Sequence, residues 1–361
     1  MPRPPRRETF DENQIGIYHC TNRCVRRAFL CGEDPFSGRS FEHRREWVRA
    51  RLEELAAIFA IDHLNFSILG NHLHVLIRNR PDIRDRWTDE EVVRRWWRLF
   101  PKRKDEQGRP AELTDAELQA MLADTPSIRQ WRGRLGHISW FMRCLAEHIA
   151  VRANREEQIS SRFWQGRFKA VRILDEAALL ACAMYIDLNP IRARLAETPE
   201  TSQFTSVYER LAAMRAVDQQ EISDSGSECV SNTEGASPSG TAGDGWLSPV
   251  LLDEEQERRE PAPVRRASNR GYLGIPFAEY LRLLDWTGRE IRADKRGSIP
   301  EDLASIFERL GIHAEVWVDL VTNFGRWFRM AAGRMENLAG ESARRGRQFL
   351  HGASHCRAAF T

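Results

Sequence analysis

Residues 69–82 read LGNHLHVLIRNRPD, an apolar run that contains two histidines two positions apart. Residues i and i+2 of a β-strand point the same way. His72 and His74 would therefore present two imidazoles side by side, while Leu73 and Val75 point to the opposite face, into the core. Two neutral imidazoles at this spacing can hold a divalent cation, and a third ligand would have to come from elsewhere. Strand histidines that only form hydrogen bonds are the other interpretation of the pattern.

The segments around this run predict the fold class. Residues 15–23, IGIYHCTNR, are rich in strand formers, and residues 40–60 carry apolar side chains at helical spacing. Two strands follow at 62–69 and 71–79, joined by a tight reversal at Gly70-Asn71. The order strand, helix, strand, strand begins a ferredoxin-like α+β sandwich, which is an antiparallel sheet with helices on one face.

The rest of the chain divides into segments of different composition. We expect one domain over residues 10–210, interrupted by a charged helical insert at 82–135. Residues 217–268 are rich in Ser, Gly, Pro and acidic residues, which predicts a disordered acidic linker. Residues 269–361 have the apolar spacing of a small C-terminal helical unit.

The net charge of +2 conceals an uneven distribution of charge along the chain. Residues 218–260 hold eleven Asp and Glu against two Arg and contribute −9, so the remainder of the chain carries +11. A basic body favours polyanions, of which nucleic acid is the commonest. A solvated, arginine-rich surface is the alternative explanation.

Three features of the sequence bear on its compartment. It has no run of about 18 apolar residues, so we expect no membrane span. The basic N-terminus lacks the apolar stretch of a secretion signal. The seven cysteines are an odd number at irregular spacing, which is typical of reduced thiols in a cytoplasmic protein.

Four sequence blocks follow one another in an order that is informative as a set. They are YHCTNR at 18–23, LGNHLH at 69–74, WQGRF at 164–168 and YIDLNPIRA at 185–193. This combination resembles the single-tyrosine HUH transposases of small insertion sequences, especially the REP-associated tyrosine transposases. The resemblance covers about residues 10–210 and leaves out the insert at 82–135 and everything after residue 217.

The resemblance implies chemistry on single-stranded or hairpin DNA. In the family, two histidines and one polar side chain hold Mg or Mn, which polarises the scissile phosphate. A tyrosine on a late helix attacks the phosphorus, stays joined to the 5′ phosphate and frees a 3′ hydroxyl, so that strands can be rejoined elsewhere in DNA transposition. For this chain the resemblance implies that His72 and His74 are the metal ligands.

The chain departs from the family at the nucleophile. The helix expected at 138–157 contains no tyrosine, although the family residue would lie near Ile149 or Ala150. Three explanations stay open: strand transfer is lost, Tyr185 has taken over, or His148 or a water at the metal attacks and gives hydrolysis. Tyr185 could equally be a ring that packs on the sheet and directs its hydroxyl to the surface.

The candidate DNA contacts lie on the extended segment after that helix. Cations for phosphates and aromatic rings for stacked bases suit single strands. The residues are Arg162, Trp164, Arg167, Lys169 and Arg172. The C-terminal unit is consistent with a DNA-binding, a homodimerisation or a docking module, and its sequence does not choose among them.

These observations predict a transposase-like DNA-binding protein that acts on single-stranded or hairpin DNA at a metal-centred His-x-His site, with DNA strand cleavage and transfer left open. The rival hypothesis is a catalytically inactive, domesticated nucleic-acid-binding regulator whose histidines are only structural. Metal content distinguishes the two, because one tightly bound divalent ion per chain favours the first.

Overall fold

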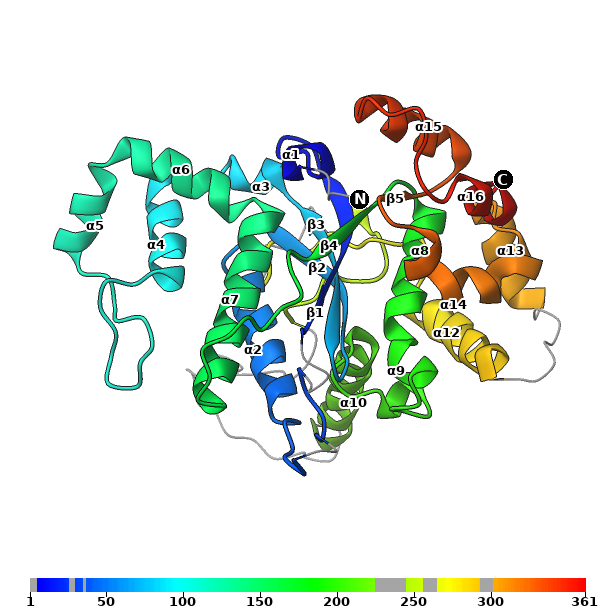
Figure 1. Ribbon diagram of the computed structural model, residues 1–361, viewed down its shortest axis with the longest axis horizontal. Coiled ribbons are helices and arrows are strands. Elements are labelled where there is room, and N and C mark those ends of the chain that lie inside the picture. Colours follow the sequence, from blue (N-terminus) through cyan, green and yellow to red (C-terminus); the bar gives the residue numbers. More distant parts are fainter. Residues whose placement is uncertain (1–4, 26–29, 35–36, 225–244, 256–264, 293–300) are drawn as a thin grey trace.

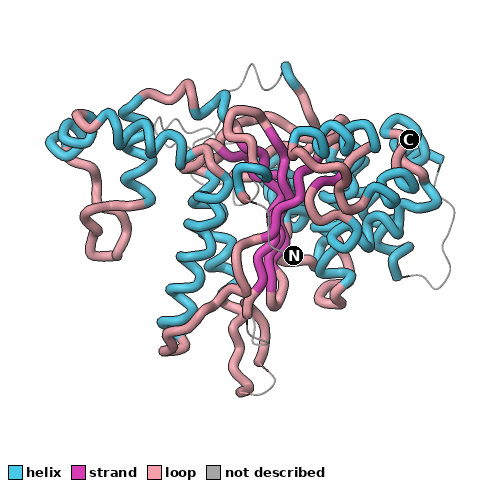
Figure 2. Tube along the Cα trace, turned by 45° about the horizontal axis from the view of Figure 1, so that its top comes forward, coloured by secondary structure: helices cyan, strands magenta, loops and turns pink. Residues whose placement is uncertain are grey.

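The described residues fold around a five-stranded sheet with strand order β2-β3-β1-β4-β5. Figures 1 and 2 show the strands running through the middle of the molecule with helices on both sides. The structure is a computed structural model, and it describes residues 5–25, 30–34, 37–224, 245–255, 265–292 and 301–361.

The first four strands have the order and the antiparallel pairing of a ferredoxin-like sheet, so the predicted α+β class is confirmed. A short fifth strand pairs in parallel with β4 and makes the sheet mixed, which the sequence did not predict. The strands are β1 (Gly16–Arg23), β2 (Ile61–Ile68), β3 (His72–Asn79), β4 (Lys169–Ile173) and β5 (Ala331–Ala332).

One face of the sheet is covered by α2 (Arg44–Ala56) and α7 (Ile138–Glu156). Val48, Leu52 and Leu55 recur at helical spacing on α2 and are fully buried. They share a core with Leu73, Val75 and other alternate residues of the strands. Leu73 and Val75 therefore point into the core, as predicted from the alternation.

The opposite face is covered as well, which corrects the expectation of helices on one face only. It carries apolar side chains of its own, including Leu64 and Leu76, and these would be left in water without a second layer. The layer is formed by α8 (Glu176–Asp187), nearly all of which is buried, and by α14 (Trp317–Trp327), which packs on it.

The insert forms a separate group of helices beyond α7, at the far end of the molecule from the C-terminal helices (Figure 1). It contains α3 (Pro81–Arg84), α4 (Asp89–Leu99), α5 (Asp115–Leu122) and α6 (Thr125–Leu135). The other helices of the described residues are α1 (Arg6–Thr9), α9 (Asn189–Arg192), α10 (Ser206–Asp224), α12 (Phe277–Arg292), α13 (Glu301–Leu310), α15 (Met335–Arg344) and α16 (Ala353–Ala359), with the 3-10 helices η1 (Pro199–Thr201) and η2 (Ala314–Val316).

The range 217–268, expected to be a disordered linker, contains ordered stretches. Helix α10 runs on to Asp224, and Trp246 is fully buried with its ring centroid 5.1 Å from that of Phe66. The N–H of Ser248 donates to the carbonyl of His63 at 2.8 Å. The expectation of disorder is therefore wrong for the residues around Trp246. An average composition over the whole range does not reveal that a single large apolar side chain is buried in the core. Residues 225–244 and 256–264 lie outside the described residues.

The C-terminal helices share a core with α8 and do not build a separate one. A single cluster of buried residues joins α8 to α12, α13 and α14. The hydroxyl of Tyr280 on α12 donates to Oδ2 of buried Asp187 at 2.6 Å. The described parts of range 269–361 are mainly helical, with the short strand β5, and they pack as part of the body. In the part of the chain that the structure describes, no helix is long and apolar enough to cross a membrane.

Candidate functional site

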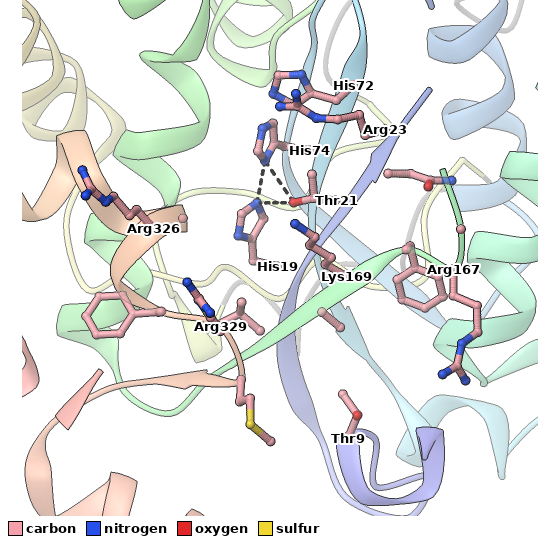
Figure 3. A pocket seen from close by; sticks show the side chains of 18 of the residues that line it. Thr9, His19, Thr21, Arg23, His72, His74, Arg167, Lys169, Arg326 and Arg329 are labelled. Carbon is pink, nitrogen blue, oxygen red and sulfur yellow. Dashed lines mark hydrogen bonds between the residues drawn. The ribbon is translucent and has the colours of Figure 1, made fainter. Parts of the chain in front are cut away.

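The two histidines of the quoted run meet a third histidine from the neighbouring strand. Antiparallel pairing of β1 with β3 places Thr21 opposite His74, so His19, Thr21 and His74 emerge on one face of the sheet. Nε2 of His19 lies 2.8 Å from Nδ1 of His74. The hydroxyl of Thr21 lies 3.3 Å from the same Nδ1 and 3.4 Å from Nε2 of His19 (Figure 3).

His72 is held by its own hydrogen bond beside this pair. Its Nδ1 donates to the side-chain oxygen of Asn71 at 2.6 Å, which leaves the lone pair on Nε2. The ring centroids of His72 and His74 are 4.9 Å apart. The structure thus places both rings on the same side of one strand, as the period of two predicts.

All three imidazoles are neutral at physiological pH. Burial lowers the pKa of His19 to about 3, and the neighbouring His72 acts in the same direction. Burial lowers the pKa of His72 to about 4, with the positive charge of Arg23 adding to the effect. Burial, reinforced by His19, also holds the pKa of His74 well below its usual value. Neutral imidazole is the form that can ligate a metal or accept a proton.

Tyr185, the tyrosine predicted as a substitute nucleophile, lies next to the histidine pair. Its ring centroid is 5.4 Å from that of His74 and 5.8 Å from that of His19, edge to face in both cases. The guanidinium of Arg192 stands 5.0 Å from the ring centroid of Tyr185. All five tyrosines are in described parts of the chain, and Tyr185 is the one that lines the cavity discussed next.

The histidines and Tyr185 line a cavity of about 710 Å³ whose wall is strongly basic. None of its lining residues is Asp or Glu. The basic residues of the lining are Arg23, Arg167, Lys169, Arg326, Arg329 and Arg345.

Most of this positive charge is not matched by carboxylates in the described structure. Arg345 is matched, because its Nε donates to Oε1 of Glu341 at 2.6 Å. Arg23, Lys169, Arg326 and Arg329 are exposed and make no ion pair with any described residue. A concave site of one charge sign concentrates counter-ions of the opposite sign. The cavity is therefore suited to an anionic ligand with several charges.

The structure brings together only part of the predicted DNA-binding set. Arg167 and Lys169 line the cavity. Trp164 does not: its ring is buried in the core under α7, and its Nε1 donates to the carbonyl of Ala146 at 2.8 Å. Its buried ring is therefore unavailable for base stacking, which corrects the prediction for this residue.

The other two predicted arginines also have structural contacts outside the cavity. Arg162 donates to the carbonyls of Trp164 and Gln165 at 2.9 and 2.8 Å. Arg172 donates to Oε2 of Glu341 at 3.0 Å, and its side chain is largely buried. Residue type and spacing could not reveal the role of Arg172, because its partner Glu341 comes from a distant part of the chain.

His148 lies on the other side of the sheet from the histidine pair. It sits on α7, which covers the face opposite to that of His19 and His74. There it lines a separate hollow together with Arg51 and Arg152. The sheet and α7 therefore separate His148 from the cavity. The hypothesis that His148 attacks a phosphate held in the cavity is not compatible with this position.

Sequence reasoning missed two groups of cavity residues. His19, Thr21 and Arg23 lie in the YHCTNR block, and their spacing of two places them on one face of the strand. Only the register with β3 shows that this is the face of His72 and His74. Arg326 and Arg329 come from the C-terminal helical region. No local pattern in the sequence connects that region with the histidines.

The described residues fit a divalent cation in part. Nε2 of His74 is buried and has no hydrogen-bond partner, and Nε2 of His72 is also left with its lone pair, so two imidazole ligands are available. Among the described residues, no group of three or more His, Cys, Asp and Glu side chains is arranged to hold a metal. Further ligands would have to be water, the Thr21 hydroxyl or phosphate oxygens of a bound strand.

Comparisons with known proteins add little to this geometry. No protein-family profile and no curated protein matches the sequence. One similar solved structure is described as a REP-associated tyrosine transposase bound to a REP hairpin. It is 11% identical, with a TM-score of 0.31, and the match covers 63% of this chain and 90% of that one. A likeness of this size carries no argument about what this chain binds or does.

Proposed function

We propose that this protein is a transposase-like DNA-binding protein that takes single-stranded or hairpin DNA into the basic cavity. The observation that carries the proposal is the lining itself: six Lys and Arg, no Asp or Glu, and a cluster of neutral histidines with Tyr185 beside it. Phosphate contacts to Lys and Arg supply most of the affinity of proteins for nucleic acid. A single strand fits better than a duplex because its backbone can bend into a concave site.

We further propose that His72 and His74 hold a divalent cation, Mn or Mg, when DNA is bound. Such an ion would withdraw charge from a phosphate oxygen and steady the charge that develops during displacement. Imidazole ligands favour Mn over Mg. In the tautomers that donate from Nδ1 of His72 to Asn71 and from Nδ1 of His74 to His19, Nε2 of each ring is left free for this role.

Within this site we propose Tyr185 as the residue that would attack a phosphate. Its phenol oxygen would form a bond to phosphorus, and the bond from phosphorus to the 3′ oxygen of the preceding nucleotide would break. The phenol proton leaves to solvent, and the departing 3′ oxygen takes up a proton to become a hydroxyl. The product is a 5′-phosphotyrosyl strand, which conserves the phosphodiester for transfer to another end.

A second candidate function is a non-cleaving, domesticated DNA-binding regulator. The observation in its favour is that helix α7 carries no tyrosine, and that the Tyr185 ring is packed against Phe324 with centroids 6.0 Å apart. A packed ring binds DNA as an element of the wall without reaching a phosphorus atom. Both candidates require DNA in the cavity, and they differ in whether a bond is broken.

The test incubates the full-length protein with end-labelled hairpin and single-stranded DNA, with and without Mn. Binding is followed by gel shift, and a covalent adduct is followed on a denaturing gel. An adduct that disappears in Tyr185→Phe, which keeps the ring and deletes the hydroxyl, supports strand transfer. Binding without an adduct or cleavage supports the regulator. Absence of binding at low salt contradicts both candidates.

A further inference from the structure

The C-terminal region supplies a wall of the cavity that the ferredoxin-like sheet alone would lack. Gly325, Arg326, Phe328, Arg329 and Met330 all line it, next to residues of β1, β3 and β4. Figure 3 shows Arg326 and Arg329 entering from the side opposite to Lys169 and Arg167, with the histidine pair between them. The cavity is therefore two-sided, and its two sides come from segments far apart in the sequence.

We propose that Arg326 and Arg329 bind phosphates of the DNA strand whose other phosphates contact Lys169 and Arg167 on the opposite side of the cavity. The C-terminal region would then be part of the DNA site. The proposal rests on the proposed function and adds to it a specific role for residues 325–330. The ligand chemistry is that of a flexible polyanion with phosphates spaced along it, held between two cationic walls.

The two arginines are held in place by buried neighbours on either side. Phe324 and Phe328 are almost completely buried, and they bracket Gly325 to Trp327 at the end of α14. The ring of Trp327 stacks on that of His355 with centroids 4.4 Å apart. The backbone that carries Arg326 is thus anchored by its apolar neighbours, while the guanidinium stays exposed.

The position of Arg329 relative to the sheet is set by backbone pairing. The N–H of Arg172 on β4 donates to the carbonyl of Met330 at 3.0 Å, and the N–H of Leu174 donates to the carbonyl of Ala332 at 2.9 Å. The ion pair between Arg172 and Glu341 ties α15 to the same strand at 3.0 Å. The segment that follows Arg329 is therefore joined to the strand that begins at Lys169.

The charge arrangement has no structural explanation within the described residues. Neither Arg326 nor Arg329 makes an ion pair there, and the facing wall adds Arg23 and Lys169 without a carboxylate. Like charges around a concavity repel one another and destabilise the empty protein. A bound polyanion relieves that repulsion, which is the physical reason for assigning the two arginines to phosphates.

The test measures binding of a fluorescent single-stranded oligonucleotide to the full-length protein over a range of salt concentrations. The variant is Arg326→Gln with Arg329→Gln, which removes charge and keeps polar side chains. The control is Arg289→Gln with Arg357→Gln, two exposed C-terminal arginines that do not line the cavity and whose loss changes the net charge equally. Melting temperatures confirm that all proteins are folded.

The cavity variant should bind about tenfold or more weakly than wild type at low salt. Its slope of log K against log salt should be shallower by about 1.4, because each lost phosphate contact on a single strand accounts for about 0.7. The control variant should keep nearly the wild-type affinity and slope. Equal behaviour of the two variants would overturn the role of Arg326 and Arg329 and leave DNA binding intact. A wild-type protein that binds no DNA would overturn the proposed function and this inference together.

Discussion

Gly325 on α14 lies directly over the hydroxyl of Tyr185. A Cβ atom at position 325 would come within 2.7 Å of the phenol oxygen and 3.2 Å of the ring carbon that bears it. The helix can approach the candidate nucleophile this closely because glycine has no side chain. The C-terminal region and Tyr185 are therefore coupled by sterics at one point.

Gly325→Ala should destabilise the protein by about 1 kcal/mol, because overpacking typically costs about 1–3 kcal/mol and a gain in helix propensity of up to about 1 kcal/mol opposes it. Gly340→Ala on α15 is the matched control, since nothing lies within 4 Å of its added methyl. That variant should be unchanged or slightly more stable. Denaturant unfolding monitors both. In Tyr185→Phe the cost of Gly325→Ala should shrink, and an unchanged cost would show that the hydroxyl is not the obstacle.

Trp246→Ala should lower the free energy of unfolding by about 3–5 kcal/mol, the usual cost of removing a buried large aromatic side chain. The ring is fully buried between Phe66 and His63, with centroids 5.1 and 5.5 Å away. Leu251→Ala, at a side chain 41% exposed, serves as control and should cost little. Equal, small effects at both positions would restore the picture of a linker that does not contribute to folding.

Because His63 is buried, we expect the free energy of unfolding to fall in mild acid. Burial lowers its pKa to about 3, so the unfolded chain binds a proton at a pH where the folded chain does not. Stability due to the neutral ring is complete above the unfolded pKa of about 6.5 and falls as the pH drops toward the folded value. At about pH 4.5 the loss is roughly 2–3 kcal/mol. His63→Leu should make the pH dependence of unfolding between these values shallower by that amount, while His19 and the other buried histidines keep their own contributions.

His72→Ala should reduce Mn binding, measured by calorimetry in the presence of an uncleavable oligonucleotide, by at least about tenfold. The melting temperature of the metal-free protein should change little, because the ring is only partly buried. His313→Ala, a partly exposed histidine outside the cavity, is the control. If Mn affinity is the same in both variants, the histidine pair is structural and the regulator becomes the better description.

A site residue could be predicted from the sequence where its position depends only on residues near it in the chain. The period of two was sufficient for His72 and His74, because alternation within one strand needs no knowledge of the rest of the fold. His19 required the register between β1 and β3, which sequence composition does not encode. The α+β class could be inferred because β1, α2, β2 and β3 follow one another at short range along the chain.

Trp164 and Arg172 illustrate where the same reasoning failed. A tryptophan between arginines has the composition of a base-stacking site, yet this ring lies under α7 and donates to Ala146. Arg172 has the side chain of a phosphate contact, yet it forms an ion pair with Glu341, which lies far along the chain. In both cases the deciding partner is a tertiary neighbour, and side-chain chemistry alone is equally compatible with either role.

The parallel pairing of β4 with β5 also has a consequence for the order of events during biosynthesis. Arg172 pairs with Ala331, so the wall that faces the histidines is made long after the histidines themselves. A nascent chain that has not yet reached residue 325 already carries His72, His74 and α8, but it lacks Arg326 and Arg329. Such a chain therefore lacks one of the two basic sides of the cavity, and under the proposed function it would bind a strand more weakly until translation has passed residue 330.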